Sequence, residues 1–293
     1  MAESNTESRH PAADGLHLQP AGQILSALLD AQIGALAGVK PALPAIEKAA
    51  EICADALARG GRMGYAGAGS SGLMALADSL ELAGTFGLPP ERTPMMFAGG
   101  ADALLHMKGA AEDDPRLAVA DLDASGLQAG DAVLILTASG RTPYALTIAQ
   151  EARARGITVV GFANVDGTPL LEMSDIAVLL RTGAEIVAGS TRMGAATAQK
   201  VALNMLSVLV GIRLGHVHDG YMVNLVADNA KLVDRAMRIV SNLASVPLPV
   251  AEAALTATQG AVKPAILVAQ GMDPERAAAE LERTGGHLQP LLA

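Results

Sequence analysis

Aromatic residues are scarce in this chain: they make up 2% of its 293 residues, and tryptophan is absent. Proteins that bind single-stranded nucleic acids stack the bases on aromatic side chains, so this class is disfavoured. The net charge of −9 opposes contact with nucleic acids or with anionic membrane surfaces. We therefore expect neither a nucleic-acid partner nor a membrane partner. An anionic ligand would have to be bound by local groups.

Cysteine is almost as rare, because Cys53 is the only one in the sequence. A single cysteine excludes an intramolecular disulfide and a thiolate metal cluster. Cys53 falls in a predicted helix, where a buried, inert thiol is expected. Two of the six histidines, His216 and His218, lie close together, but no further ligands follow at metal-binding spacing. The sequence predicts no metal and no cofactor.

Long apolar runs are also missing from the sequence. No uninterrupted apolar run reaches the ~18 residues that a membrane span requires. The N-terminus lacks the pattern of a secretory signal peptide. We therefore expect a cytoplasmic protein.

Hydrophobic residues make up 51% of the chain and charged residues 17%, which favours a large buried core. From Met63 onward, short apolar runs alternate with helical segments, which is typical of a parallel sheet covered by helices on both faces. The predicted strands are 63–66, 94–97, 132–137, 157–162 and 175–180. The predicted helices are 20–36, 43–59, 72–82, 101–109, 143–154, 190–214 and 222–243.

Three regions are expected along the chain. Residues 1–19 are polar and aperiodic, and they predict an N-terminal arm that orders only against something else. Residues 20–247 hold the α/β domain with its flanking helices. After Pro247 and Pro249, residues 248–293 predict a small all-helical C-terminal appendage.

The stretch Gly67-Ala-Gly-Ser-Ser-Gly72 follows the first predicted strand and opens a helix. Gly69 allows a tight turn, and Ser70 and Ser71 supply hydroxyl groups. Unpaired N–H groups and the positive end of the helix dipole coincide at a helix N-terminus, so this loop favours an anion. Its glycines also spell GxGxxG, a weak signal for a dinucleotide site when it stands alone.

A second loop, Thr137 to Pro143, also follows an apolar strand and opens a helix. Ser139 and Thr142 supply hydroxyls, and Gly140 allows close approach of the backbone; ordinary capping is the alternative interpretation. Ligands of parallel sheets bind outside the carboxyl ends of the strands, where both loops are expected to lie. Two such loops suit a phosphate with neighbouring sugar hydroxyls. No acid ends the 94–97 strand to hold a ribose, which disfavours the dinucleotide reading.

Three further segments carry acidic residues. Glu81 follows one helix length after the first loop, among apolar neighbours that would desolvate it and raise its pKa. Glu112 begins an acidic run with Asp113 and Asp114, which are themselves expected to be solvated. A last loop, 183–192, carries Glu185, Ser190 and Thr191 to another helix N-terminus.

Several of these motifs together resemble N-acetylmuramic acid 6-phosphate etherases, which belong to the sugar isomerase (SIS) domain superfamily. The matching motifs are Gly-Ala-Gly-Ser-Ser-Gly at 67–72, Glu81 with Thr85-Phe86, Ala98-Gly-Gly100, Glu112-Asp-Asp114, Ala138-Ser-Gly-Arg-Thr-Pro-Tyr144, Gly189-Ser-Thr-Arg-Met193, Thr197-Ala-Gln-Lys200 and the Asn229–Ala236 segment. The resemblance begins at Thr6 and covers nearly the whole chain. It implies a SIS-type three-layer α/β/α fold and a homodimer.

The resemblance also implies a reaction. The D-lactyl ether at C3 of N-acetylmuramic acid 6-phosphate is cleaved by elimination and hydration, which gives N-acetylglucosamine 6-phosphate and D-lactate. The family's acid corresponds to Glu81 and its base to Glu112. Phosphate and sugar hydroxyls would be bound by Gly69, Ser70, Ser71, Ser139, Gly140, Thr142, Glu185, Ser190 and Thr191.

Two departures from the family pattern concern cations. Leu73 stands where the family commonly has arginine, and Gly194 stands where it commonly has lysine. They leave open which group is recognised at the lactyl end of the substrate. Two other functions remain as alternatives on the same fold. One is a sugar-phosphate-binding regulator without turnover, and the other is an aldose–ketose phosphate isomerase with Glu185 as its base.

Overall fold

The computed structural model describes residues 6–107, 109–227 and 229–292. Its contacts divide the chain into two compact units. The first contains Met1–Ser79 and Glu91–Leu206, and the second contains Leu80–Pro90 and Ser207–Ala293. The expected C-terminal appendage, residues 248–293, lies within the second unit, which also includes the segment 207–247 and the end of one long helix.

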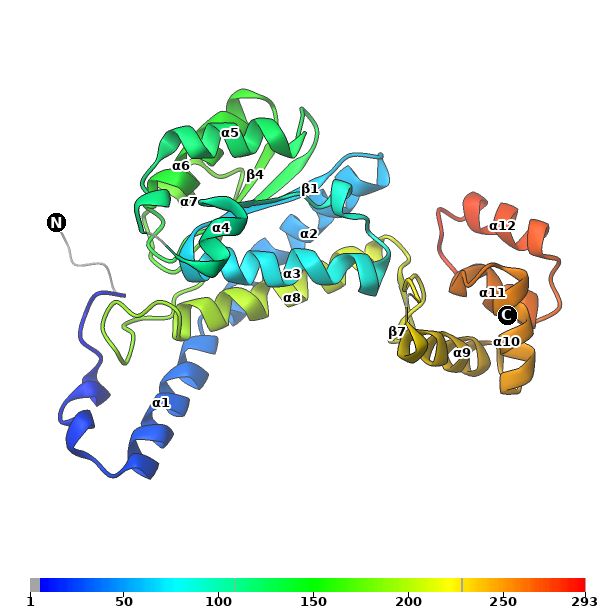
Figure 1. Ribbon diagram of the computed structural model, residues 1–293, viewed down its shortest axis with the longest axis horizontal. Coiled ribbons are helices and arrows are strands. Elements are labelled where there is room, and N and C mark those ends of the chain that lie inside the picture. Colours follow the sequence, from blue (N-terminus) through cyan, green and yellow to red (C-terminus); the bar gives the residue numbers. More distant parts are fainter. Residues whose placement is uncertain (1–5, 108, 228, 293) are drawn as a thin grey trace. The chain divides into compact units, whose positions relative to one another are not determined.

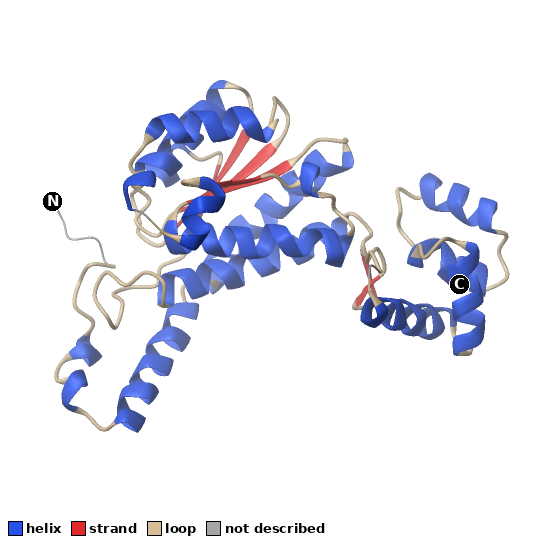
Figure 2. Ribbon diagram, viewed as in Figure 1, coloured by secondary structure: helices blue, strands red, loops and turns tan. Residues whose placement is uncertain are grey.

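A five-stranded parallel sheet forms the centre of the first unit (Figure 2). The strands lie in the order β2-β1-β3-β4-β5. Their bounds are Met63–Gly67 for β1, Met95–Phe97 for β2, Ala132–Leu136 for β3, Thr158–Ala163 for β4 and Ile176–Leu179 for β5. In register, Gly67 pairs with Phe97 on one side and with Leu136 on the other. All five predicted strands are confirmed.

Helices cover both faces of the sheet. Figure 1 shows α5 (Pro115–Ser125) and α6 (Pro143–Ala154) over one face, and α2 (Leu43–Ala58) on the other. The central strands β1 and β3 are buried on both sides because their residues alternate between these two helical layers. This arrangement confirms the three-layer α/β/α fold. Helix α5 is an addition that the sequence analysis missed, because its short run Pro115–Ser125 carries charges that obscure its apolar face.

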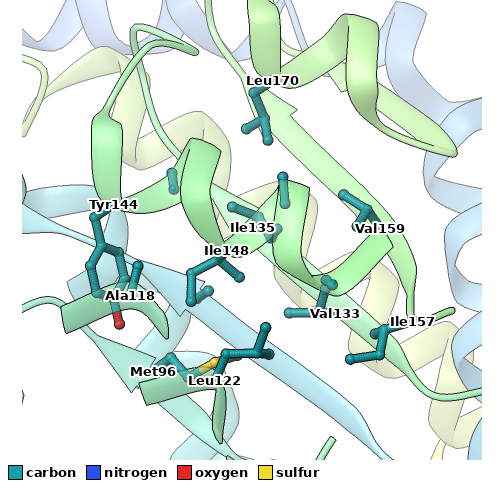
Figure 3. Packing of buried hydrophobic residues seen from close by; sticks show 14 of the residues in the cluster. Met96, Ala118, Leu122, Val133, Ile135, Tyr144, Ile148, Ile157, Val159 and Leu170 are labelled. Carbon is teal, nitrogen blue, oxygen red and sulfur yellow. The ribbon is translucent and has the colours of Figure 1, made fainter. Parts of the chain in front are cut away.

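The core beneath α5 and α6 is formed by buried hydrophobic side chains (Figure 3). Val133 and Ile135 of β3 point toward Ile148 of α6 and Leu122 of α5, and all four are at most 1% exposed. Close packing of such β-branched and aliphatic side chains fixes the distance of each helix from the sheet. The same packing therefore fixes the loops in which the strands end.

The remaining helices of the first unit are α1 (Ala21–Leu36), α4 (Gly100–Leu105) and α7 (Pro169–Met173). Short 3₁₀ helices lie at Pro11–Ala13, Leu16–Leu18, Lys40–Ala42, Pro90–Arg92 and Gly109–Ala111. Two long helices, α3 (Gly69–Phe86) and α8 (Gly194–Arg213), begin in the first unit and end in the second.

The second unit has its own apolar core, formed by α9 (Ala230–Ala244), α10 (Leu248–Ala257), α11 (Val262–Ala269) and α12 (Pro274–Arg283). Ile239, Leu255 and Ile266 are among its buried side chains. A two-stranded ribbon, β6 (Val217–His218) with β7 (Tyr221–Met222), precedes α9. The ribbon was not predicted, because two-residue strands leave no periodic signal. The helix expected over 222–243 begins only at Ala230, after the ribbon and a loop.

The prediction about membrane spans needs a correction. By length and composition, two helical stretches within the described residues, Ala21–Ala58 and Gly194–Arg213, are apolar enough to cross a membrane. In α8, however, Ala198, Ala202 and Leu206 are fully buried within the protein. The apolar composition of α8 therefore reflects its packing inside the protein. Counting uninterrupted apolar residues in the sequence did not detect this helix as a candidate span.

Candidate active site

The first loop positions the N-terminus of α3 directly after β1. A Cβ atom added to Gly67 would lie 2.9 Å from the Cα of Gly72, and one added to Gly72 would lie 2.7 Å from the ring of Phe97. Only glycine permits this contact between the strand end and the first turn of the helix. Gly69 lies between them with a φ of +52°, a conformation that side chains disfavour. The first N–H groups of α3 and the hydroxyls of Ser70 and Ser71 are thereby held at the sheet edge.

The second loop gathers hydroxyl groups at the N-terminus of α6. The Thr137 hydroxyl lies 2.7 Å from that of Thr142 and 3.3 Å from that of Ser139. The backbone N–H of Arg141 donates to the Ser139 hydroxyl at 3.2 Å. Thr142 is the N-cap of α6, and its side chain makes no capping hydrogen bond. Its hydroxyl therefore remains part of this cluster, whose three residues line a cavity.

Glu112 lies opposite the first loop. Its carbonyl accepts a hydrogen bond from the Tyr144 N–H at 3.0 Å, so the first turn of α6 fixes its backbone. A Cβ added to Gly69 would lie 3.8 Å from Glu112 Oε2, which places the carboxyl group over the anion-seeking turn. Partial burial, followed by the nearby charge of Asp113, raises the pKa of Glu112. A carboxylate with a raised pKa is a stronger base.

These loops enclose a cavity of about 400 Å³. Seven residues of the predicted site line it: Gly69, Ser70, Ser71, Glu112, Ser139, Thr142 and Thr191. The structure thus brings together both hydroxyl-rich loops, one carboxylate and the loop that precedes α8.

Three other predicted site residues lie near this cavity without lining it. Gly140 has a φ of +67°, and a Cβ there would overlap the side chain of Thr168, so this glycine shapes the loop. The N–H of Ser190 donates to the Val187 carbonyl at 2.9 Å within its own turn. Glu185 is 4% exposed and accepts hydrogen bonds from the N–H groups of Gly194 and Ala195, at 2.9 and 2.8 Å. Its carboxylate caps α8.

Glu81 lies on α3, about three turns after Gly69. The expectation that apolar neighbours desolvate it is wrong for this chain: the Glu81 side chain is exposed, and its neighbour Leu80 is 70% exposed. The error arises because Leu80 and Leu82 lie on different sides of the helix, and only Leu82 is buried. Glu81 is not among the residues that line the cavity.

The cavity also contains residues that sequence reasoning did not assign to the site. Thr6 and Glu7 come from the N-terminal arm. Asp113 and Arg141 lie in motifs from which other residues, Glu112, Ser139 and Thr142, were predicted to form the site. Arg141 was discoverable from its place in the second loop. Thr6 and Glu7 lie 60 residues or more before the first loop, in a polar, aperiodic segment whose pattern does not indicate a place in the site.

The arrangement can bind an anion and transfer a proton. Hydroxyls and helix N-termini suit a phosphate. Glu112 lines the same cavity, where its carboxylate could accept a proton from a group bound beside that phosphate. Within the described residues, no group of three or more His, Cys, Asp or Glu side chains could hold a metal ion.

A larger cavity of about 830 Å³ lies within the second unit, lined mostly by apolar residues and glycines. Its buried Lys263 donates a hydrogen bond to the Gly286 carbonyl at 3.0 Å, and burial lowers the pKa of this lysine to about 8. The lysine thereby ties α11 to the turn that follows α12. Paired hydroxyl-rich helix N-termini occur at the smaller cavity, so we assign the chemistry there.

Comparison with known proteins agrees with this geometry. Residues 36–164 match the SIS domain family model. The chain is 41% identical over 288 residues to the N-acetylmuramic acid 6-phosphate etherase of Deinococcus radiodurans, covering 98% of this chain and 94% of that protein. The chain belongs to the N-acetylmuramic acid 6-phosphate etherase family.

Other relatives support the same family and fold. The etherase of Cronobacter sakazakii is 40% identical over 98% of this chain and 97% of that protein. A phosphoheptose isomerase from Francisella tularensis shares the fold with a TM-score of 0.52, at 22% identity, over 66% of this chain and all of that chain. The predicted family and fold class are confirmed.

The structure gives a physical reason for one departure from the etherase family pattern. A Cβ added to Gly194 would lie 2.9 Å from the Cβ of Ala35 and 3.1 Å from Glu185 Oε2. A side chain at position 194 would therefore displace α1 or the carboxylate that caps α8. Leu73, the other departure, is half-buried on α3. The local packing in this chain is adapted to glycine at position 194.

Replacing Ser139 with alanine should weaken the binding of inorganic phosphate by about tenfold, because the hydroxyl cluster loses one hydrogen bond to an ionised group. Isothermal titration calorimetry measures this loss. Ser26→Ala on the exposed surface of α1 is the matched control and should bind phosphate as the wild type does. Equal affinities for all three proteins would show that the second loop does not contact the anion.

Proposed function

We propose that this protein cleaves the D-lactyl ether of N-acetylmuramic acid 6-phosphate, giving N-acetylglucosamine 6-phosphate and D-lactate. The observation that carries this proposal is the Glu112 carboxyl group, held over two anion-seeking loops in a chain of the etherase family. The activity would serve the catabolism of cell-wall amino sugars. The expected cytoplasmic location stays a prediction.

In this proposal the phosphate group binds between the N-termini of α3 and α6. Ser70, Ser71, Ser139 and Thr142 donate hydrogen bonds to phosphate or sugar hydroxyls, and Thr191 adds a further hydroxyl to the lining of the cavity. The helix dipoles offset the negative charge of the ligand, which the net charge of −9 would otherwise repel. The sugar then lies beside Glu112.

The first chemical step is removal of the proton at C2. In the open-chain form of the sugar, the aldehyde at C1 acidifies this proton, and Glu112 accepts it. The C3–O bond then breaks, and lactate leaves with a proton from an acid. Finally, water adds to the unsaturated intermediate: its hydroxyl group goes to C3 and a proton returns to C2. Well-placed proton transfer contributes about 10²–10⁴-fold to each such step.

We assign the acid role to Glu81 and propose that it acts in a homodimer. Because Glu81 is exposed in the single chain, a partner subunit can provide the environment that keeps it protonated. Exposed apolar side chains support self-association. Leu25, Leu29 and Ile33 follow one another at helical spacing on α1 and are 66, 58 and 57% exposed.

The contacts of Glu185 argue against an isomerase that would use this residue as its base. Both carboxylate oxygens accept N–H groups of α8, and the side chain is buried. A carboxylate that caps a helix in this way would weaken both hydrogen bonds on accepting a proton, and Glu185 is not among the residues that line the cavity. Glu112 faces the cavity and needs no such rearrangement.

Glu112→Gln should lower lactate release and C2 proton exchange together, by at least about 10²-fold, because the base is lost. Wild-type protein in ¹⁸O water should give product labelled at C3 together with free lactate. Since the base acts in its ionised form, kcat/KM of the wild type should fall as the pH drops through the raised pKa of Glu112, above the ordinary value of 4.5. Tight binding without product would instead indicate a regulator.

Glu81→Gln should block lactate release while still permitting C2 proton exchange, because only the acid for the leaving group is lost. Exchange is followed by NMR in deuterated water, and lactate by an enzymatic assay. Glu91→Gln, an exposed change in another part of the chain, is the control. Lactate release at a near wild-type rate by Glu81→Gln would refute the acid assignment.

A further inference from the structure

The N-terminal arm is bound against the candidate active site. Thr6 is 1% exposed, and its carbonyl accepts a hydrogen bond from the Gly189 N–H at 3.0 Å. Thr6 and Glu7 both line the 400 Å³ cavity, together with Gly189 and Thr191 from the loop before α8. The arm that was expected to order only against something else is thus bound to the wall of the site.

The position of Glu7 depends on glycine at position 189. Gly189 has a φ of +72°, and a Cβ atom there would lie 2.7 Å from Glu7 Oε2. Any larger residue would push the carboxylate away. Glu7 is exposed and lines the cavity, so it is not part of the buried core.

The charges at the cavity decide what Glu7 can contact. Of the described residues that line it, Glu7, Glu112 and Asp113 are acidic and Arg141 is basic. An ionised carboxylate accepts hydrogen bonds and cannot donate them. It is repelled by a phosphate, which in any case has donors at the N-termini of α3 and α6. The partners that suit Glu7 are therefore the hydroxyl and amide N–H donors of a sugar.

We infer that Glu7 is a specificity-determining residue that accepts hydrogen bonds from the sugar hydroxyls or the acetamido N–H of the bound sugar phosphate. This inference rests on the proposed function for the location of the ligand. The arm then contributes recognition of the sugar, while the two loops contribute recognition of the phosphate.

The test compares the affinities of full-length variants for two probes, N-acetylglucosamine 6-phosphate and inorganic phosphate, by calorimetry. Glu7→Ala should lower the affinity for N-acetylglucosamine 6-phosphate by about tenfold or more, because a hydrogen bond to a charged acceptor is lost. Its affinity for inorganic phosphate should change less than twofold. Glu7→Gln, which keeps a carbonyl acceptor, should recover part of the loss.

The matched control is Asp14→Ala, which removes an acid from the same arm. Asp14 is exposed and pairs with Arg9 at 2.7 Å, and this change should alter neither affinity. If Glu7 only held the arm in place, Glu7→Ala would lower the affinities for both probes by the same factor, and the inference would be overturned. Unchanged affinity for the sugar phosphate would overturn it as well.

Turnover by the wild type is measured alongside, so that the two hypotheses can fail separately. A selective loss of sugar-phosphate binding in Glu7→Ala, with no lactate released by the wild type, would support the role of Glu7 and refute the etherase. The opposite result is also informative. If the wild type releases lactate and the Glu7→Ala variant binds both probes normally, the etherase is supported and the role of Glu7 is refuted.

Discussion

The site depends on the junction between β1 and α3, where a strand end and a helix start approach within van der Waals contact. Gly67 and Gly72 make this junction possible, since a side chain on either would meet the backbone or ring of its neighbours. The parallel pairing of β1 with β3 then brings the second loop to the same edge, because Gly67 and Leu136 are in register. Two helix N-termini thereby face one cavity, and this is the physical basis for binding an anion in an acidic protein.

Buried carboxylates connect the elements that lie behind this edge of the sheet. Glu185 caps α8, and Asp78 of α3 accepts a hydrogen bond from the Tyr65 hydroxyl at 2.9 Å and lies 3.5 Å from the ammonium group of Lys200 on α8. Burial and the adjacent Asp78 raise the pKa of Tyr65, which keeps it a donor. Buried charges with partners of this kind are costly to disrupt. They tie β1, α3 and α8 together behind the loops, so that the site rests on a fixed frame.

Much of the architecture could be predicted from the sequence, because the strands are apolar runs and the loops after 67 and 137 carry glycines and hydroxyls at helix starts. The local pattern could not show which side of a helix each residue occupies. Glu81 was therefore expected to be desolvated, although it is exposed. Glu185 was expected in the site, although it caps α8. Glu7 was missed because its place is set by contact with Gly189, some 180 residues further along the chain.

In the proposed complex, the phosphate of the sugar lies between the N-termini of α3 and α6, with the sugar extending toward Glu112. A crystal structure of the protein with N-acetylglucosamine 6-phosphate tests this most directly. We expect phosphate oxygens within hydrogen-bond distance of Ser70 or Ser71 on one side and of Ser139 or Thr142 on the other, and C2 of the sugar near the Glu112 carboxylate. A phosphate bound away from both loops, or a sugar directed away from Glu112, would contradict it.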